Sequence, residues 1–295
     1  MSRQQTAAQG HKIDAGSARG PGAARELRAV SALGAAAPRR LEGGDVSPWL
    51  SVILPAYNEA ASLAQAVEAH VRVLQRLNLP GYEVVIVDDG SADETAAVAR
   101  GLVANNACIS LLRLERNVGQ AAAILAGFAA ARGRWLLHNG VDLPLSPAEL
   151  PSLVRLLEAA DALGTGGPTL LVVERQDRTA YSWRRRLLSW TNVLLVRLLF
   201  HSPVCDHNFV QIYQRDLLAA LTPVSRGAST VTLELIVRAY RQGCRVLAVS
   251  APYQPRRTGR SRLRMGTAWH ALRETLRLRW LLWMERWRGT SRDAR

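Results

Sequence analysis

A run of apolar residues that ends in two carboxylates constrains the fold of this chain more than any other segment. Residues 84–87 are uninterrupted valine and isoleucine, and Asp88 and Asp89 follow directly. Such a run is typical of a strand buried on both faces, and Ser91 with Glu94 three residues later predicts a capping box that begins a helix at once. Since ligands bind at the carboxyl edge of open α/β sheets, the two acids are predicted to lie at a binding edge.

The same order of strand, polar turn and helix occurs on both sides of this segment. Repeated units of this kind predict an α/β fold, in which a mainly parallel, Rossmann-like sheet is flanked by helices. The predicted units are strand 51–55, turn 56–59 and helix 60–77, then strand 109–114, turn 117–120 and helix 121–132, then strand 135–138.

Three short segments, in this order, carry a resemblance to a known family. They are residues 54–59 (Leu-Pro-Ala-Tyr-Asn-Glu), residues 87–91 with Asp93 and Thr95, and residues 116–119 (Arg-Asn-Val-Gly). In them the chain resembles the family 2 glycosyltransferases, and the resemblance extends from residue 50 to about residue 265. It implies the fold called GT-A and a nucleotide-sugar donor.

The second half is similar to the dolichol-phosphate mannosyltransferase branch, which passes a sugar from a nucleotide to a polyprenyl phosphate. An Arg-x-x-Ser-x-x-Asn pattern at residues 186–192 opens an apolar helix that leads to Asp206, and residues 209–215 match a strand of that branch. Residues 256–262 resemble its R-x-x-G-x-S-K element, with Arg262 in place of lysine. The resemblance implies transfer from a UDP- or GDP-linked sugar to a polyprenyl phosphate.

The residue types at the predicted sheet edge suit a nucleotide. A carboxylate at Asp88 or Asp89 accepts hydrogen bonds from a base N–H or a ribose hydroxyl. The alternatives are that one acid caps a helix or faces solvent, that Pro55 ends a strand, that Tyr57 is a packed aromatic, and that Gly119 is a turn glycine. The predicted nucleotide-binding residues are Pro55, Tyr57, Glu59, Asp88, Asp89, Asn117 and Gly119.

The predicted metal site departs from the family pattern. The family has Asp-x-Asp where this chain has Gly140-Val141-Asp142, so Asp142 is the carboxylate left to hold Mg²⁺ or Mn²⁺. Substrate phosphates and waters can complete the coordination of such an ion. His138 or Asn139 could contribute if the turn is rearranged. The alternatives are that residues 139–140 form only a turn, and that the chain is a non-catalytic nucleotide-sugar-binding protein.

The acceptor determines which further residues the reaction needs. A lipid phosphate is already ionised at neutral pH and needs no strong general base, whereas a hydroxyl acceptor would need one at Asp206 or Glu234. Otherwise Asp206 orients the acceptor or an arginine, and Glu234 pairs with Arg238. Attack on the anomeric carbon opposite the leaving diphosphate predicts inversion. The predicted catalytic residues are Asp142, Asp206 and Arg256, and the predicted acceptor-phosphate ligands are Arg256, Arg257, Arg260, Ser261 and Arg262.

Net charge and cysteine content narrow the expected partners. The formal charge is +14, but Lys12 is the only lysine among 38 basic residues, and such a skew reflects genomic base composition as much as function. No nucleic-acid partner is therefore expected. The alternative for residues 256–262 is a solvated basic loop, but their match to the branch element favours the functional interpretation. Three widely spaced cysteines argue against a disulfide framework and fit a reducing cytosol.

Aromatic and arginine residues near the end of the chain predict contact with a membrane surface. Trp269, Trp280, Trp283 and Trp287 lie among arginines, as in helices at the lipid headgroup level, although a helix packed on the core with a basic outer face is an equal alternative. The apolar stretch 187–200 is shorter than the roughly 20 residues that cross a bilayer. We expect a protein peripheral to the cytoplasmic membrane face, bound there directly or through a membrane-protein partner.

Three parts of the chain are expected. Residues 1–47 are rich in Ala, Gly, Ser, Pro and Arg and predict a disordered N-terminal arm, with no apolar segment typical of a secretory signal. Residues 48–265 are the predicted GT-A domain. Residues 266–295 are predicted to form an amphipathic C-terminal helix.

Overall fold

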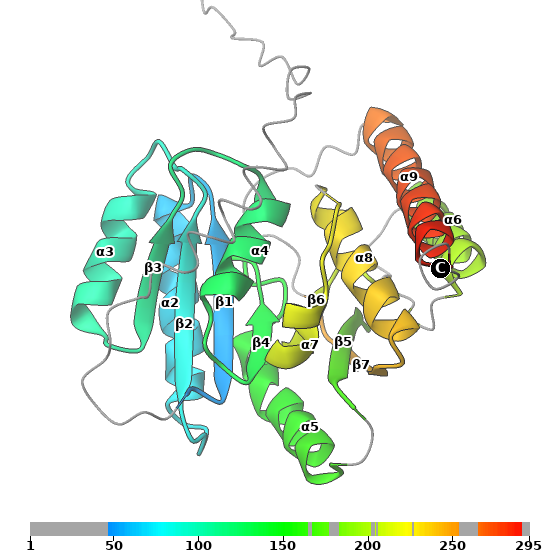
Figure 1. The fold of residues 1–295 in the computed structure, drawn as a ribbon. Helices are drawn as coiled ribbons and strands as arrows, with labels where there is room; N and C mark the ends of the chain where they lie inside the picture. Colours follow the sequence, from blue (N-terminus) through cyan, green and yellow to red (C-terminus); the bar gives the residue numbers. More distant parts are fainter. Residues whose placement is uncertain are drawn as a thin grey trace, which may run out of the picture.

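A seven-stranded sheet organises the computed structural model, which describes residues 47–164, 167–176, 183–201, 204, 206–225, 227–253 and 265–290 (Figure 1). The strand order is β3-β2-β1-β4-β6-β5-β7, and β6 alone runs antiparallel to its neighbours. The predicted α/β class with a mainly parallel sheet is confirmed. The strands are β1 (Leu50–Ala56), β2 (Tyr82–Asp88), β3 (Ile109–Arg113), β4 (Trp135–His138), β5 (Thr169–Arg175), β6 (Val210–Gln214) and β7 (Arg245–Ala251).

Helices cover both faces of this sheet (Figure 1). One face packs against α2 (Ala60–Leu74), α3 (Thr95–Asn105) and α5 (Leu150–Ala162), which follows the short 3₁₀ helix η1 (Pro147–Glu149). The other packs against α4 (Gln120–Ala130), α7 (Arg215–Ala220) and α8 (Ala228–Arg241). This layering explains the apolar run in β2, because Val84 and Ile86 belong to one core and Val85 and Val87 to the other.

The order of the strands creates a crevice beside β1. The chain moves from β1 through α2 to β2 and through α3 to β3, and then returns through α4 to β4 on the opposite side of β1. Loops that leave neighbouring strands in opposite directions open a crevice at the carboxyl edge, where α/β proteins bind ligands. A glycine lets α4 approach closely here, since a Cβ on Gly127 would lie 2.4 Å from Ile53 Cγ2.

Two further helices form a separate layer beside α8. They are α6 (Trp183–Phe200) and α9 (Met265–Thr290), and Figure 1 shows them side by side. Leu278 and Leu282 of α9 are buried with Val196 of α6 and Val237 of α8. The predicted C-terminal helix therefore has a core-packing face. Within the described ranges, no helix combines the length and the apolar character that crossing a bilayer requires.

Candidate functional site

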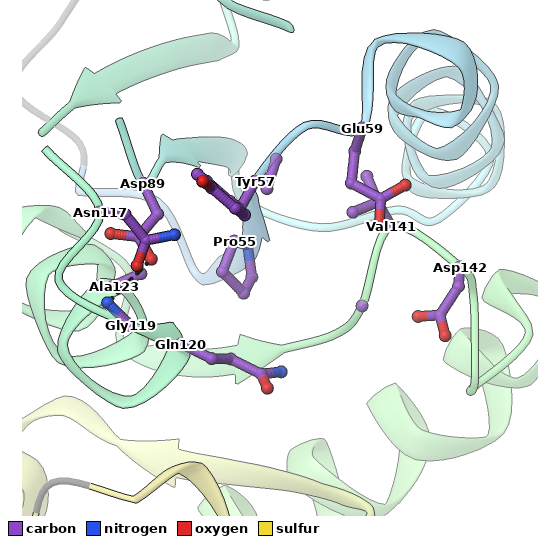
Figure 2. A pocket seen from close by; sticks show the side chains of 12 residues that line it. Pro55, Tyr57, Glu59, Asp89, Asn117, Gly119, Gln120, Ala123, Val141 and Asp142 are labelled. Carbon is purple, nitrogen blue, oxygen red and sulfur yellow. Dashed lines mark hydrogen bonds between the residues drawn. The ribbon is translucent and has the colours of Figure 1, made fainter. Parts of the chain in front are cut away.

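A pocket open to solvent, with a cavity volume of about 220 Å³, lies at the carboxyl edge of β1 and β4. Six of the seven predicted nucleotide-binding residues line it, together with Asp142 (Figure 2). The lining residues are Pro55, Ala56, Tyr57, Glu59, Asp89, Asn117, Gly119, Gln120, Ala123, Gly140, Val141 and Asp142.

The pocket has two unlike sides. Figure 2 shows Asp89, Asn117 and Gly119 on one side of Tyr57, and Glu59 and Asp142 on the other. The Tyr57 side chain is 46% exposed, so its ring is available to a ligand rather than packed in the core. The structure therefore places acceptor groups on both sides of an accessible aromatic ring.

Asp89 holds the loop before α4. Its Oδ1 accepts the N–H of Val118 at 2.8 Å, and its Oδ2 accepts the N–H of Gly119 at 3.0 Å. Burial raises the pKa of Asp89, while these two amide hydrogen bonds oppose that change. Each carboxylate oxygen can accept a second hydrogen bond, so Asp89 can fix the loop and still accept one from a ligand.

Asp88 has a different environment from its neighbour. Its side chain is completely buried, Arg113 Nε lies 3.2 Å from Oδ2, and Oδ1 accepts the N–H of Ser91 at 2.9 Å. These contacts order the turn after β2. Of the two predicted acids, the structure brings only Asp89 to the pocket wall.

The capping box predicted from Ser91 and Glu94 is wrong. Helix α3 begins at Thr95, and Glu94 makes no side-chain capping bond. Ser91 Oγ instead accepts the N–H of Asn58 at 3.0 Å, and Thr95 Oγ1 accepts the N–H of Glu59 at 2.8 Å. These residues tie the turn after β1 to the turn after β2, and so fix Tyr57 and Glu59 at the pocket.

The beginning of α4 faces the same pocket. Gly119 occupies the N-cap position with φ 93°, a conformation that favours glycine, and Gln120 begins the helix. The unpaired N–H groups at a helix N-terminus attract anions such as a diphosphate. Gln120 and Ala123 line the pocket and were not predicted from the sequence, because only the fold shows that α4 points its first turn at the crevice.

A buried cluster fixes the turn that carries Asp142. Asn139 Oδ1 accepts the N–H of Gly140 at 3.0 Å, and Asn139 Nδ2 donates to the Leu145 carbonyl at 2.9 Å and lies 3.1 Å from His70 Nε2. Burial lowers the pKa of His70 to about 4, so this ring is neutral at neutral pH. His70 of α2 was not predicted, since it lies 69 residues away from its partner.

The two polar residues before Gly140 are not placed as metal ligands. Asn139 is buried and uses both of its polar atoms within the turn. His138 is buried against Phe128, with ring centroids 5.9 Å apart, and burial lowers its pKa to about 4. Among the described residues, no three His, Cys, Asp or Glu side chains are grouped so as to hold a metal ion. In the described part of the chain, the residues present fit a cation only if Asp142 shares it with oxygen ligands from elsewhere, such as those of a diphosphate.

The predicted acids of the second half lie outside the pocket lining. Asp206 is buried, and its oxygens accept from Arg175 Nε at 2.6 Å and Nη2 at 2.8 Å. Glu234 is fully buried and pairs with Arg238 Nε at 2.7 Å, which confirms the predicted i, i+4 ion pair. It also accepts the N–H groups of Val224 and Ser225.

The predicted acceptor-phosphate residues lie outside the described part of the chain. They are Arg256, Arg257, Arg260, Ser261 and Arg262.

Comparisons with known proteins agree with this architecture. A family model described as Glycosyl transferase family 2 matches residues 51–222. The undecaprenyl-phosphate 4-deoxy-4-formamido-L-arabinose transferases of Serratia proteamaculans and Pseudomonas paraeruginosa are 31% and 33% identical, each over 58% of this chain and over 51% and 49% of the relative. The chain thus spans about half the length of these curated relatives.

An archaeal relative and a solved structure extend these comparisons. Glycosyltransferase AglD of Haloferax volcanii is 30% identical over 70% of this chain and 33% of its own length. The structure of glucosyl-3-phosphoglycerate synthase from Mycobacterium tuberculosis with Mn²⁺, uridine diphosphate and phosphoglyceric acid has a TM-score of 0.60 at 18% identity, and covers 86% of this chain and 82% of that one. This likeness is one of fold.

Proposed function

Because the chain belongs to glycosyl transferase family 2, we propose that it transfers a sugar from a UDP- or GDP-linked donor to a polyprenyl phosphate, with inversion of the anomeric centre. The pocket is the main support for a nucleotide-sugar donor, because it brings together six predicted nucleotide-binding residues from three separate turns. The acceptor half is supported by relatives whose names specify undecaprenyl-phosphate sugar transfer.

The residues of the pocket suggest how the donor is held. Asp89 accepts a hydrogen bond from the base or the ribose, and the accessible ring of Tyr57 stacks against a planar group. The N-terminus of α4 attracts the diphosphate. A divalent cation, when bound, neutralises charge on the leaving nucleoside diphosphate, and Asp142 is the side chain that would hold it.

The state of Asp206 and Glu234 favours a phosphate acceptor over a hydroxyl. A general base must have a carboxylate that can reach the reacting proton. The Asp206 carboxylate is engaged in an ion pair with Arg175. The Glu234 carboxylate is engaged in an ion pair with Arg238 and in hydrogen bonds from two backbone amides. A polyprenyl phosphate attacks through an oxygen that is already ionised. We propose that Arg256, Arg257, Arg260, Ser261 and Arg262 position that phosphate.

The proposal predicts a clear choice between two lipids. The protein should transfer sugar from its preferred donor to undecaprenyl phosphate and not to undecaprenol, because the alcohol would need a base to remove its proton. Incubation with radiolabelled UDP- and GDP-sugars, followed by extraction of labelled lipid, measures both reactions. Transfer to the alcohol at a comparable rate would favour the hydroxyl-acceptor alternative.

We also propose that the protein works as a peripheral protein at the cytoplasmic membrane face. Support comes from two stripes of exposed apolar side chains at helical spacing, Trp190, Leu194 and Leu198 on α6 and Leu276, Trp280 and Trp283 on α9. Large exposed apolar faces suit a membrane interface, and Arg277, which is 64% exposed, adds attraction to anionic lipids.

Serine at both Trp280 and Trp283 is expected to weaken binding to vesicles that contain phosphatidylglycerol by about tenfold, since each indole contributes apolar area to the bilayer interface. Sedimentation with vesicles measures the effect. Tyr240→Ser is the matched control, because Tyr240 is an exposed aromatic of α8 outside both stripes. Equal losses in the control and the double variant would show that α9 has no special role.

A further inference from the structure

The turn after β4 begins inside the fold rather than at its surface. Ile53 is the last residue of β1 that pairs with β4, opposite His138, whereas β1 itself continues to Ala56. The turn therefore starts below the end of the neighbouring strand, and its first residue, Asn139, is buried. Because buried backbone groups need hydrogen-bond partners, this turn depends on partners within the protein.

One side-chain amide supplies such partners at both ends of the turn. Asn139 Oδ1 accepts the N–H of Gly140 at 3.0 Å and the N–H of Leu145 at 3.4 Å, and Asn139 Nδ2 donates to the Leu145 carbonyl at 2.9 Å. Between these ends, Leu143 has a φ of 52°, a conformation that its surroundings must hold. The amide therefore joins the start of the turn to its end, and the second hydrogen of Nδ2 is left for a further acceptor.

His70 of α2 provides that acceptor. Its Nδ1 lies 2.8 Å from the carbonyl of Ala66, which can only accept a hydrogen bond, so Nδ1 carries the proton. Burial lowers the pKa of the ring to about 4, so at neutral pH Nε2 carries no proton. Asn139 Nδ2 lies 3.1 Å from this Nε2 and donates to it. Reversal of the amide would bring its oxygen against two acceptors, so all of its contacts agree on one orientation.

The turn that is held in this way forms one side of the pocket. Residues 140–142 line the pocket, and Asp142 lies on the opposite side of Tyr57 from Asp89 and Asn117 (Figure 2). Under the proposed function, Asp89 contacts the base or the ribose, whereas Asp142 faces the diphosphate through a cation. A change confined to this turn is therefore expected to affect the diphosphate and not the nucleoside.

We propose that His70 is a positioning residue of the donor site, which acts through Asn139 to anchor residues 140–145 to α2. The inference rests on the proposed function for its effect on nucleotide binding, whereas the contacts that carry it belong to the protein alone. Loss of the Nε2 acceptor leaves a buried N–H of Asn139 without a partner. Other positions of the amide are then favoured, and both ends of the turn are released.

Three substitutions distinguish an anchor from a residue that only fills space. His70→Gln can place an acceptor where Nε2 lies, His70→Asn reaches only the position of Nδ1, and His70→Phe keeps a ring without either nitrogen. Calorimetry with Mn²⁺ should show UDP or GDP binding weakened about tenfold by Phe and by Asn, but less than about threefold by Gln. Binding of uridine or guanosine, which lack the diphosphate, should stay the same in all three.

Amide hydrogen exchange tests the anchor without any ligand. His70→Phe and His70→Asn should speed exchange within residues 140–145 about tenfold, and His70→Gln should not. Ser51→Ala is the matched control, because Ser51 is also fully buried and joins two segments, donating to Glu83 at 2.7 Å and accepting the N–H of Gly133 at 2.8 Å. This control should leave exchange within residues 140–145 unchanged.

The outcomes separate this inference from the proposed function. Unchanged exchange within residues 140–145 in a folded His70→Phe protein, or a Gln variant no better than the Asn variant, overturns the inference. Faster exchange with unchanged nucleotide affinity overturns the role at the donor site. Failure of the parent protein to bind either nucleotide overturns the proposed function, while the exchange data still decide the anchor. Thermal unfolding shows which variants are folded, and the comparison of Asn with Gln decides if Phe is not.

Discussion

Replacing Asp89 with alanine is expected to weaken nucleotide binding by about 100-fold. The substitution removes the acceptor of the Val118 and Gly119 N–H groups, which fix the loop before α4. Hydrogen bonds to a charged group contribute about 1.5–3 kcal/mol each. If the ligand must then order the loop, a cost of about 3 kcal/mol corresponds to about 100-fold in affinity. Calorimetric titration with UDP and GDP measures the change.

A second aspartate provides the control for this experiment. Asp161 accepts from Arg134 Nη2 at 2.7 Å and from Trp135 Nε1 at 3.2 Å, and is not among the residues that line the pocket. Asp161→Ala therefore also removes two hydrogen bonds, but should leave nucleotide affinity unchanged. An Asp89→Ala protein that is folded and binds nucleotide as tightly as the parent would contradict the assignment of this pocket to the donor.

The elements that the sequence predicted well are those specified by local patterns. Four apolar residues in succession predicted the buried strand β2, and the predicted strand 135–138 coincides with β4 (Trp135–His138). A strand that is buried on both faces is apolar at every position, so it can be recognised in the sequence as an uninterrupted apolar run. The three turns that follow parallel strands could be placed at one edge for the same reason, and six predicted residues do meet in one pocket.

What the sequence did not predict depends on contacts between distant residues. Ser91 and Glu94 have the spacing of a capping box, but the Ser91 hydroxyl oxygen accepts a hydrogen bond from the N–H of Asn58, 33 residues away. Asp88 ends β2 and is buried beside Arg113, whereas Asp89 follows the strand and reaches the pocket. The contact between Asp88 and Arg113 becomes evident only in the sheet, because the two residues lie on neighbouring strands.

The degenerate metal motif shows the same limit. The sequence indicates only that glycine stands where the family has an acid. The fold shows that the Asp142 carboxylate lies in the space beside Gly140, and that Asn139 of the turn contacts His70 of α2. Neither contact can be read from the sequence, because the fold brings α2 and the end of β4 together.

Replacing Asp206 with alanine is expected to lower the free energy of unfolding by about 3–5 kcal/mol, the usual cost of leaving one member of a buried ion pair without its partner. The Arg175 side chain is 18% exposed, and its guanidinium packs over the adjacent rings of Phe209 and Tyr253, 5.8 and 5.5 Å from their centroids, so it cannot turn freely to water. Chemical denaturation measures the loss.

Arg175→Ala and the double variant distinguish a structural Asp206 from a catalytic one. If the pair is structural, each single variant destabilises the protein, and the double variant is less unstable than the sum of the two predicts, because each removes the same interaction. If Asp206 is instead the base for a hydroxyl acceptor, Asp206→Asn should abolish kcat while stability stays near that of the parent. The buried two-point contact between Arg175 and Asp206 favours the first result, and with it a phosphate acceptor that needs no base.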